Sequence, residues 1–288
     1  MKIGITGASG FIGRRAARLA AARGWDVVPF SRQPRDARTR PFVPGEPAGV
    51  DGLDAVLHLA GEPVVGRWTA DKRRRILDSR VLGTRSIVEG FARAARPPAV
   101  LVSASGIGFY GNTGDRPVDE NSPAGRGFLA DVCRAWEAEA MKVRRGRVVL
   151  LRIGLVLGRD GGTMKRILPV FRAGLGGRLG SGRQWMSCVH INDLAGMALW
   201  AVEKEAIAGP LNAVMPSPVT NSEFTRLLGR AVRRPAILPA PAFLLRAVLG
   251  EMSSLLLDSS RVLPQVACAC DYRYEFADVA AAVDDVTR

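Results

Sequence analysis

The sequence predicts an α/β fold: a parallel sheet doubly wound with helices on both faces, followed by a smaller α/β lobe. Two observations support this prediction. Over the first 153 residues, short apolar runs alternate with helical stretches, an order typical of right-handed βαβ units. Where the first expected strand turns into the first expected helix, three glycines recur at a spacing of three residues, namely Gly7, Gly10 and Gly13.

The elements of the large sheet are expected in a regular order. Strands are predicted over residues 3–6, 26–30, 55–59, 99–103 and 148–153. Helices are predicted between them, over residues 12–23, 71–95 and 127–143. Parallel sheets of this kind bind ligands beyond the carboxyl ends of their strands, so the loops that follow the strands should converge on one cleft.

The alternation loosens after Gly158, where the glycines at 161–162 and within 174–182 indicate loops. A short strand is predicted over 210–213 and helices over 193–202, 221–232 and 243–249, with Asn221 or Ser222 as an N-cap. We therefore expect one domain over residues 1–160 with a returning segment at about 186–215. Residues 161–185 and 216–288 are expected to form the small lobe.

The glycine turn at Gly7–Gly13 has one economical physical use. It lets a strand turn sharply into a helix, brings the backbone close to a ligand, and presents the helix N-terminus to a negative group such as a pyrophosphate. A turn that binds nothing would need one or two glycines rather than three in register. The turn therefore predicts a dinucleotide site at the start of the chain.

The composition excludes several other classes of protein. The chain has 288 residues, and 47% of them are hydrophobic, as in a globular protein with a filled core. No apolar run reaches the roughly 18 residues of a membrane helix, and the N-terminus leads into the glycine turn rather than a secretion signal. We therefore expect a cytoplasmic protein without a membrane partner.

Metal binding and nucleic-acid binding are not expected either. The four cysteines have no Cys-x-x-Cys spacing and the chain has two histidines, so we predict no metal site. The net charge is +14, but the basic residues are scattered and no cluster is interleaved with aromatic side chains. This pattern argues against nucleic acid and favours attraction of an anionic cofactor or substrate.

The end of the second strand indicates which dinucleotide binds. An acid at this place would accept hydrogen bonds from the ribose hydroxyls and favour NAD. Ser31 and Arg32 offer a hydroxyl and a guanidinium instead, which suit a 2′-phosphate, so we expect NADP(H). The alternative is that Arg32 is one more solvent-exposed arginine in a chain that has many.

Five other residues allow two interpretations each. His58 lies in an apolar run and His190 precedes an expected helix, and we interpret both as structural rather than as ligands. Arg67, Trp68 and Lys72 could hold an acidic or phosphorylated substrate. Equally, Trp68 could pack beneath the next helix while Lys72 stays in water.

Several motifs occur together along nearly the whole chain. They are Thr6–Gly13, Leu59-Ala60-Gly61, Ser103-Ala104-Ser105 before Tyr110-Gly111, and Val189–Ala195. Together they resemble the extended short-chain dehydrogenase/reductases. A second set is Gly61-Glu62-Pro63, Arg67-Trp68-Thr69, Ser79-Arg80, Cys133–Glu137, Gly158–Gly162 and Arg261–Pro264. This set resembles an atypical subgroup, the "epimerase family protein" group, which is similar to NAD-dependent epimerases and dehydratases and has its own C-terminal domain.

The resemblance implies a Rossmann-type N-terminal domain that binds NADP(H) and a C-terminal substrate lobe. The pyrophosphate side would be held by Gly7, Ser9, Gly10, Phe11, Ile12 and Gly13. Ser31 and Arg32 would meet the adenosine phosphate. The ribose would be lined by Leu59, Ala60, Gly61 and Glu62, with Arg80 nearby. The nicotinamide would be flanked by Ser103, Ile153, Gly154 and Leu155.

The family's chemistry needs two residues that this chain lacks. In the family, a tyrosine exchanges a proton with the substrate during hydride transfer, and a lysine four residues later lowers the tyrosine pKa. Counted back from Glu137, those positions hold Leu129 and Cys133. Tyr110 is the candidate substitute and Ser105 a candidate substrate ligand, although either could serve only packing or backbone hydrogen bonding.

Two functions remain open at this point. The first is an NADP(H)-dependent oxidoreductase or epimerase-like enzyme with an atypical proton-transfer group. Its substrate would be a polar or anionic small molecule such as a nucleotide sugar, and the protein would be a monomer or homodimer. The second is an NADP(H)-binding protein without turnover that acts as a sensor or scaffold.

Overall fold

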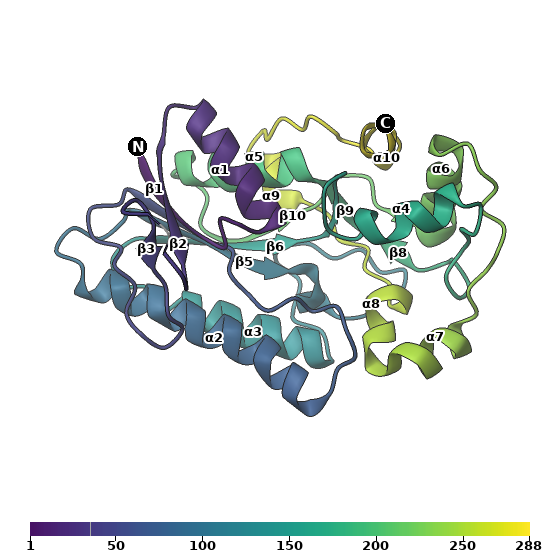
Figure 1. The fold of residues 1–288 in the computed structure, drawn as a ribbon, viewed down its shortest axis with the longest axis horizontal. Helices are drawn as coiled ribbons and strands as arrows, with labels where there is room; N and C mark the ends of the chain where they lie inside the picture. Colours follow the sequence, from purple (N-terminus) through teal and green to yellow (C-terminus); the bar gives the residue numbers. More distant parts are fainter. Residues whose placement is uncertain (35) are drawn as a thin grey trace.

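The computed structural model describes residues 1–34 and 36–288, and its centre is a seven-stranded parallel sheet (Figure 1). The strand order is β10-β6-β5-β4-β1-β2-β3. The strands are β1 (Lys2–Thr6), β2 (Asp26–Ser31), β3 (Arg40–Pro41), β4 (Ala55–His58), β5 (Val100–Gly106), β6 (Arg147–Ile153) and β10 (Gly209–Ala213). The direction of winding reverses between β1 and β4, which confirms the predicted doubly wound fold.

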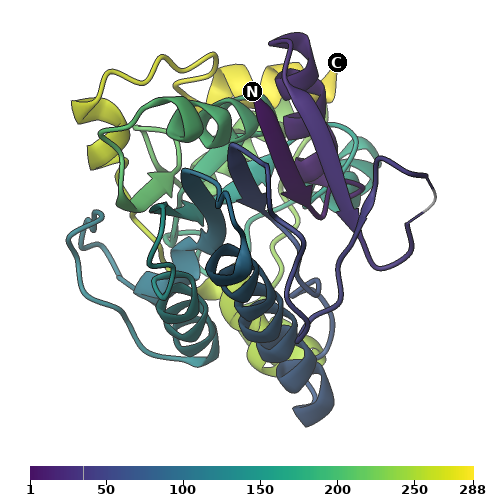
Figure 2. The ribbon, with the colours of Figure 1, turned by 90° about the vertical axis from the view of Figure 1, so that its left-hand side faces the viewer.

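Helices cover both faces of this sheet (Figure 2). One face carries α1 (Phe11–Ala22) and α5 (Ile191–Glu203), and the other carries α2 (Ala70–Arg93) and α3 (Phe128–Ala140). Successive strand residues enter opposite cores: Leu57 packs on the α1 and α5 side, and Val56 packs on the other side. A sheet covered on both faces requires such continuous apolar strands, and this explains the unbroken apolar runs in the sequence.

A second group of elements lies outside the large sheet. It contains two small sheets, in which β7 (Leu155–Leu157) pairs with β9 (Cys188–His190) and β8 (Trp185–Met186) pairs with β11 (Val219–Thr220). Its longer helices α4 (Met164–Arg172), α6 (Asn221–Ala231) and α10 (Val279–Thr287) contribute to a separate core. The short helices are η1 (Ile107–Tyr110), α7 (Ala242–Leu249), η2 (Gly250–Ser253), α8 (Ser254–Leu257) and α9 (Gln265–Ala269).

The predicted elements of the first 153 residues are present, with small shifts at their ends. The prediction missed the helices α4 and α10 and the short strands β3, β7, β8, β9 and β11. Pro169 lies inside α4 and is unfavourable within a helix, although the buried residues Met164, Leu168 and Phe171 have helical spacing. The predicted N-cap of α6 was wrong. Thr220 caps it, because its hydroxyl accepts a hydrogen bond from the backbone N–H of Glu223.

Candidate functional site

The glycine turn joins β1 to α1 at the carboxyl end of the sheet. Gly7 has a φ of +67°, and its carbonyl oxygen accepts a hydrogen bond of 2.9 Å from the N–H of Gly10. A Cβ added to Gly13 would lie 2.1 Å from the same carbonyl oxygen. A Cβ added to Gly7 would lie 3.1 Å from the backbone of Leu59. The turn therefore needs glycine at both positions for the backbone to close.

The N-terminus of α1 is open to an anion. Gly10 is its N-cap, and no side chain caps the first turn. The first turn contains no acidic residue, and both Ser9 and Gly10 are exposed. Arg14 adds positive charge at this helix end. Its guanidinium is held there by a 2.6 Å hydrogen bond that it donates to the carbonyl of Ser9. Free N–H groups, the helix dipole and this arginine all favour a negative ligand here.

The side chain of Phe11 points away from such a ligand. Its ring packs on the loop after β7, where a Cβ added to Gly158 or Gly161 would lie 2.6 or 2.4 Å from a ring atom. The second glycine cluster of the sequence therefore makes room for Phe11. Only the backbone N–H of this residue is left to meet a ligand.

Ser31 and Arg32 lie at the end of β2. The Ser31 hydroxyl donates to the carbonyl of Gln33 and accepts from its N–H, each at 3.1 Å. Arg32 is exposed and takes part in none of the ion pairs formed within residues 1–34 and 36–288. Its guanidinium is therefore available to a ligand of opposite charge.

Thr6 and His58 hold the start of the loop after β4. The Thr6 hydroxyl accepts from the N–H groups of Leu59 and Ala60 at 3.0 and 3.1 Å, so its own proton goes to Nδ1 of His58 at 2.8 Å. Burial, followed by the charge of Arg80, lowers the pKa of His58 to about 4. The imidazole is neutral and structural, as interpreted from the sequence.

Helix α2 fixes the rest of this loop through Glu62. Its N–H donates to the Ser79 hydroxyl at 2.9 Å, its carbonyl accepts from Arg80 at 3.0 Å, and its carboxylate pairs with Lys72 at 2.6 Å. The hydrogen bond from Lys72 lowers the pKa of Glu62. The Arg80 guanidinium also lies beside Gly61, whose added Cβ would be 3.4 Å from Cζ.

The expected tyrosine and lysine positions on α3 hold an alkyl group and a neutral thiol. Leu129 packs against Gly108, whose added Cβ would lie 3.1 Å from Cβ of Leu129. Cys133 contacts the carbonyl of Gly106 at 3.6 Å, and burial raises the pKa of its thiol. Neither side chain can replace the pair in acid–base chemistry.

A buried polar network lies next to these positions. Arg152 on β6 forms a two-point ion pair with Glu137 on α3, at 2.9 and 2.8 Å, and both side chains are less than a tenth exposed. Glu137 also accepts a 2.6 Å hydrogen bond from Ser105. Arg152 donates to the Tyr110 hydroxyl at 2.8 Å, and Tyr110 donates to Asn212 at 2.8 Å. The network joins β5, α3, β6 and β10.

The geometry does not support Tyr110 as the substitute proton donor. The residue is 2% exposed, its proton is donated to Asn212, and burial raises its pKa to about 12. The packing interpretation fits these contacts. The Ser105 hydroxyl likewise donates to Glu137 and is 4% exposed. Ser103 is fully buried beside it, and its hydroxyl lies 3.4 Å from the carbonyl of Ala104.

The sequence signals for this network were present but were not used. Arg152 is a charged residue inside the apolar run of β6, and a buried charge in such a run needs a partner. Glu137 was used only as the reference position from which the expected tyrosine and lysine positions were located. Asn212 had no local signal, because its partner Tyr110 is 102 residues away in the chain.

The remaining candidates have structural contacts. Trp68 donates to the carbonyl of Val64 at 2.7 Å and packs on Phe128 at a ring distance of 5.1 Å, which favours packing over substrate binding. His190 is the N-cap of α5, because its Nδ1 accepts from the N–H of Asn192. Within the described part of the chain, no group of three His, Cys, Asp or Glu residues could hold a metal ion. No helix in that part is long and apolar enough to cross a membrane.

Comparisons with known proteins cover the whole chain. Residues 3–213 match the NAD dependent epimerase/dehydratase family, and residues 240–286 match a domain of unknown function, DUF1731. The mouse epimerase family protein SDR39U1 is 37% identical over an aligned length of 292 residues, and the alignment covers 99% of each chain. Its chloroplastic homolog from Arabidopsis thaliana is 37% identical over 290 residues, covering 96% of this chain and 84% of that protein.

A solved structure is also similar over its full length. The crystal structure of human SDR39U1 (isoform 2) with NADPH has a TM-score of 0.94 and 34% sequence identity. The match covers 100% of this chain and 99% of the human chain. Because a relative is named as chloroplastic, the cytoplasmic location expected from the sequence stays a prediction.

Proposed function

This chain belongs to the NAD-dependent epimerase/dehydratase family, and from that premise we propose that it binds NADP(H) across the amino end of α1. The main support is the open N-terminus of α1, which has no capping side chain, no acid in its first turn and Arg14 beside it. An NADPH-containing structure at 34% identity adds support. When bound, the cofactor would donate a hydride to a substrate as NADPH or accept one from it as NADP⁺.

The residues that would hold the cofactor lie at the ends of adjacent strands. The pyrophosphate would be met by Gly7, Ser9, Gly10, Phe11, Ile12 and Gly13, with Phe11 acting through its N–H. Arg32, exposed beside Ser31, would bind the 2′-phosphate. The ribose would be lined by Leu59, Ala60, Gly61 and Glu62. The nicotinamide would be flanked by Ile153, Gly154 and Leu155, whereas Ser103 is fully buried within the sheet.

Arg80 would supply the positive charge that the missing lysine would have given. Its guanidinium lies beside Gly61 and stacks 5.0 Å from the Trp136 ring centroid. It also lies near the neutral Cys133 thiol on α3. A fixed cation here can orient a ribose or an anionic substrate, but it cannot exchange protons at neutral pH.

We propose an oxidoreductase or epimerase-like activity toward a polar or anionic small molecule, with the large-sheet domain and the C-terminal lobe enclosing the cleft. The large-sheet domain would comprise 1–160 and about 186–215, and the lobe 161–185 and 216–288. Support for the returning segment comes from α5 and β10, which join the large sheet and its core. The protein would be a monomer or homodimer, which light scattering can distinguish.

A second function has its own support. Leu129 and Cys133 occupy the tyrosine and lysine positions, and the Tyr110 and Ser105 hydroxyls are used inside the fold. These observations favour a protein that binds NADP(H) without turning it over. It would then act as a sensor or scaffold.

Calorimetry with NADPH and NADH, followed by a turnover assay, tests both functions. We expect NADPH to bind more tightly than NADH. Oxidation or reduction of bound cofactor with any member of a panel of carbonyl compounds and sugar nucleotides would establish the enzyme. Tight NADPH binding with no turnover across the panel would support the second function. No binding of either nucleotide would reject both.

A further inference from the structure

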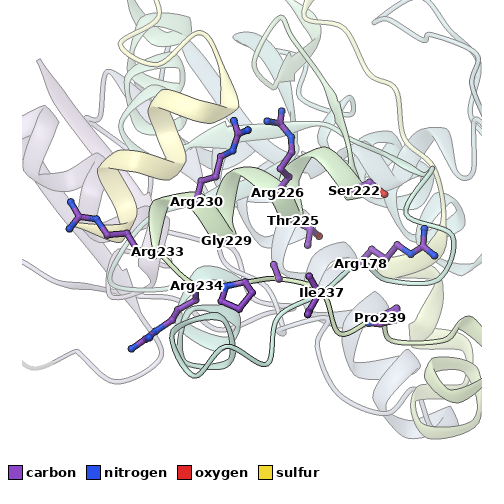
Figure 3. A pocket seen from close by; sticks show the side chains of 12 residues that line it. Arg178, Ser222, Thr225, Arg226, Gly229, Arg230, Arg233, Arg234, Ile237 and Pro239 are labelled. Carbon is purple, nitrogen blue, oxygen red and sulfur yellow. The ribbon is translucent and has the colours of Figure 1, made fainter.

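A cavity of about 740 Å³ lies on the C-terminal lobe, between α6, the segment that follows it and the loop before β8 (Figure 3). None of the residues proposed above to hold the cofactor lines it. Five arginines line it and no acidic residue does: Arg178, Arg226, Arg230, Arg233 and Arg234. The cavity is therefore a concentrated positive site that the proposed function does not use.

The protein offers these arginines few acidic partners to neutralise their charge. Arg226 lies 3.7 Å from Glu223, and both side chains are about half exposed, so the pair is weak. The other four arginines form none of the ion pairs found among the described residues. An anion bound in the cavity would offset this positive charge.

The backbone around the cavity is held in place. The buried face of α6 includes Phe224 and Leu228, which anchor the helix in the core of the lobe. Arg226 and Arg230 are four residues apart, so they share one face of α6, and in Figure 3 both extend to the same side. After α6, the N–H of Arg234 donates to the carbonyl of Gly229 at 3.0 Å.

The opposite wall is also fixed. The N–H of Leu238 donates to the carbonyl of Gly176 at 3.1 Å, and the N–H of Ala240 donates to the carbonyl of Arg178 at 2.9 Å. The segment after α6 is thus tied to the loop that carries Arg178. Ile237, 77% exposed, gives this wall an apolar surface. The cavity exists before any ligand binds.

We propose that this cavity binds a soluble small molecule with two or more phosphate groups. Guanidinium groups bind phosphate oxygens in pairs, and those lining this cavity are spread along its walls, so a ligand with several phosphates can contact more of them than a single phosphate can. The exposed hydroxyl of Ser222 offers a further hydrogen bond. The volume lies in the range of small-molecule sites, roughly 300–1,000 Å³. The exposed Ile237 can contact an apolar part of the ligand, such as a nucleoside.

Titration calorimetry of the full chain with inorganic tripolyphosphate tests the proposal. We expect one site per chain, weakened as salt is raised, and unaffected by saturating NADPH. Competition between the two ligands would overturn the proposal, because the tripolyphosphate would then occupy the cofactor site. Absence of binding at low salt would also overturn it.

Two double variants that each remove two positive charges distinguish binding in this cavity from a general attraction of anions to a basic protein. Arg226→Gln with Arg230→Gln should weaken tripolyphosphate binding at least about tenfold. The control, Arg93→Gln with Arg144→Gln, removes two exposed arginines elsewhere and should change binding less than about twofold. Equal losses would overturn the proposal. So would binding to phosphatidylglycerol vesicles that depends on Arg226 and Arg230 when tripolyphosphate does not bind.

Discussion

Replacing Gly10 with Asp should weaken cofactor binding without lowering the stability of the fold. Gly10 has φ −73° and ψ 171°, which any residue adopts, and it is the exposed N-cap of α1. Asp is among the best N-cap residues, so its carboxylate would accept hydrogen bonds from the first turn. The unliganded protein should keep its stability to within about 0.5 kcal/mol. An added Cβ would lie 3.1 Å from the Gly7 carbonyl, a tight contact that offsets part of the gain.

The same carboxylate should displace the pyrophosphate. It would occupy N–H groups proposed to bind the cofactor, at a cost of about 1.5–3 kcal/mol per lost charge-assisted hydrogen bond. Repulsion between the carboxylate and the pyrophosphate would add about 1–4 kcal/mol, depending on how much water screens them. The NADPH dissociation constant should therefore rise by about 10² to 10⁵.

Calorimetry with NADPH and urea unfolding without it measure the two effects separately. Gly10→Asn is the matched control, because it also caps the helix but adds no charge, and it should weaken binding by about tenfold. If Gly10→Asp were as stable as the parent and bound NADPH equally well, the cofactor could not lie at this helix end. The reasoning would then be refuted.

Three further predictions concern other parts of the site. Arg32→Ala should weaken NADPH binding at least about tenfold and leave NADH binding nearly unchanged in calorimetry, and equal weakening of both would reject the 2′-phosphate assignment. Glu137→Gln should lower the free energy of unfolding by about 3–5 kcal/mol, because Arg152 is then buried without its counter-charge. The double change Glu137→Met with Arg152→Met should cost much less in urea unfolding, and an equal cost would contradict this account. Because burial lowers the pKa of His58 from 6.5 to about 4, the unfolded chain binds the extra proton, and stability should fall by roughly 3 kcal/mol as the pH drops across that window. Unfolding measured at several pH values should show a smaller loss over that window in His58→Gln.

Much of the candidate site could be predicted because its signals are local. The glycine turn is specified within a few residues, since Gly7 needs a positive φ and Gly13 needs room for the Gly7 carbonyl. The absence of a tyrosine and a lysine four residues apart on α3 is also visible in the chain alone. The missed helix α10 had such a signal too, with buried residues at helical spacing after the capping Asp278.

The sequence by itself determined the order of the main strands and helices over the first 153 residues, the glycine turn and the departure from the family's acid–base pair. Only the tertiary structure decided which polar groups are used inside the fold. The sequence places Ser105 and Tyr110 after a strand whose end is expected to face the cleft. In the structure, the Tyr110 hydroxyl donates its proton to Asn212 and the Ser105 hydroxyl donates to Glu137. The cationic cavity likewise forms only when α6 packs against the loop of Arg178. The physical reason is range: a turn or a helix follows from neighbouring residues, whereas the partner of a buried hydroxyl is chosen by packing between segments far apart in the chain.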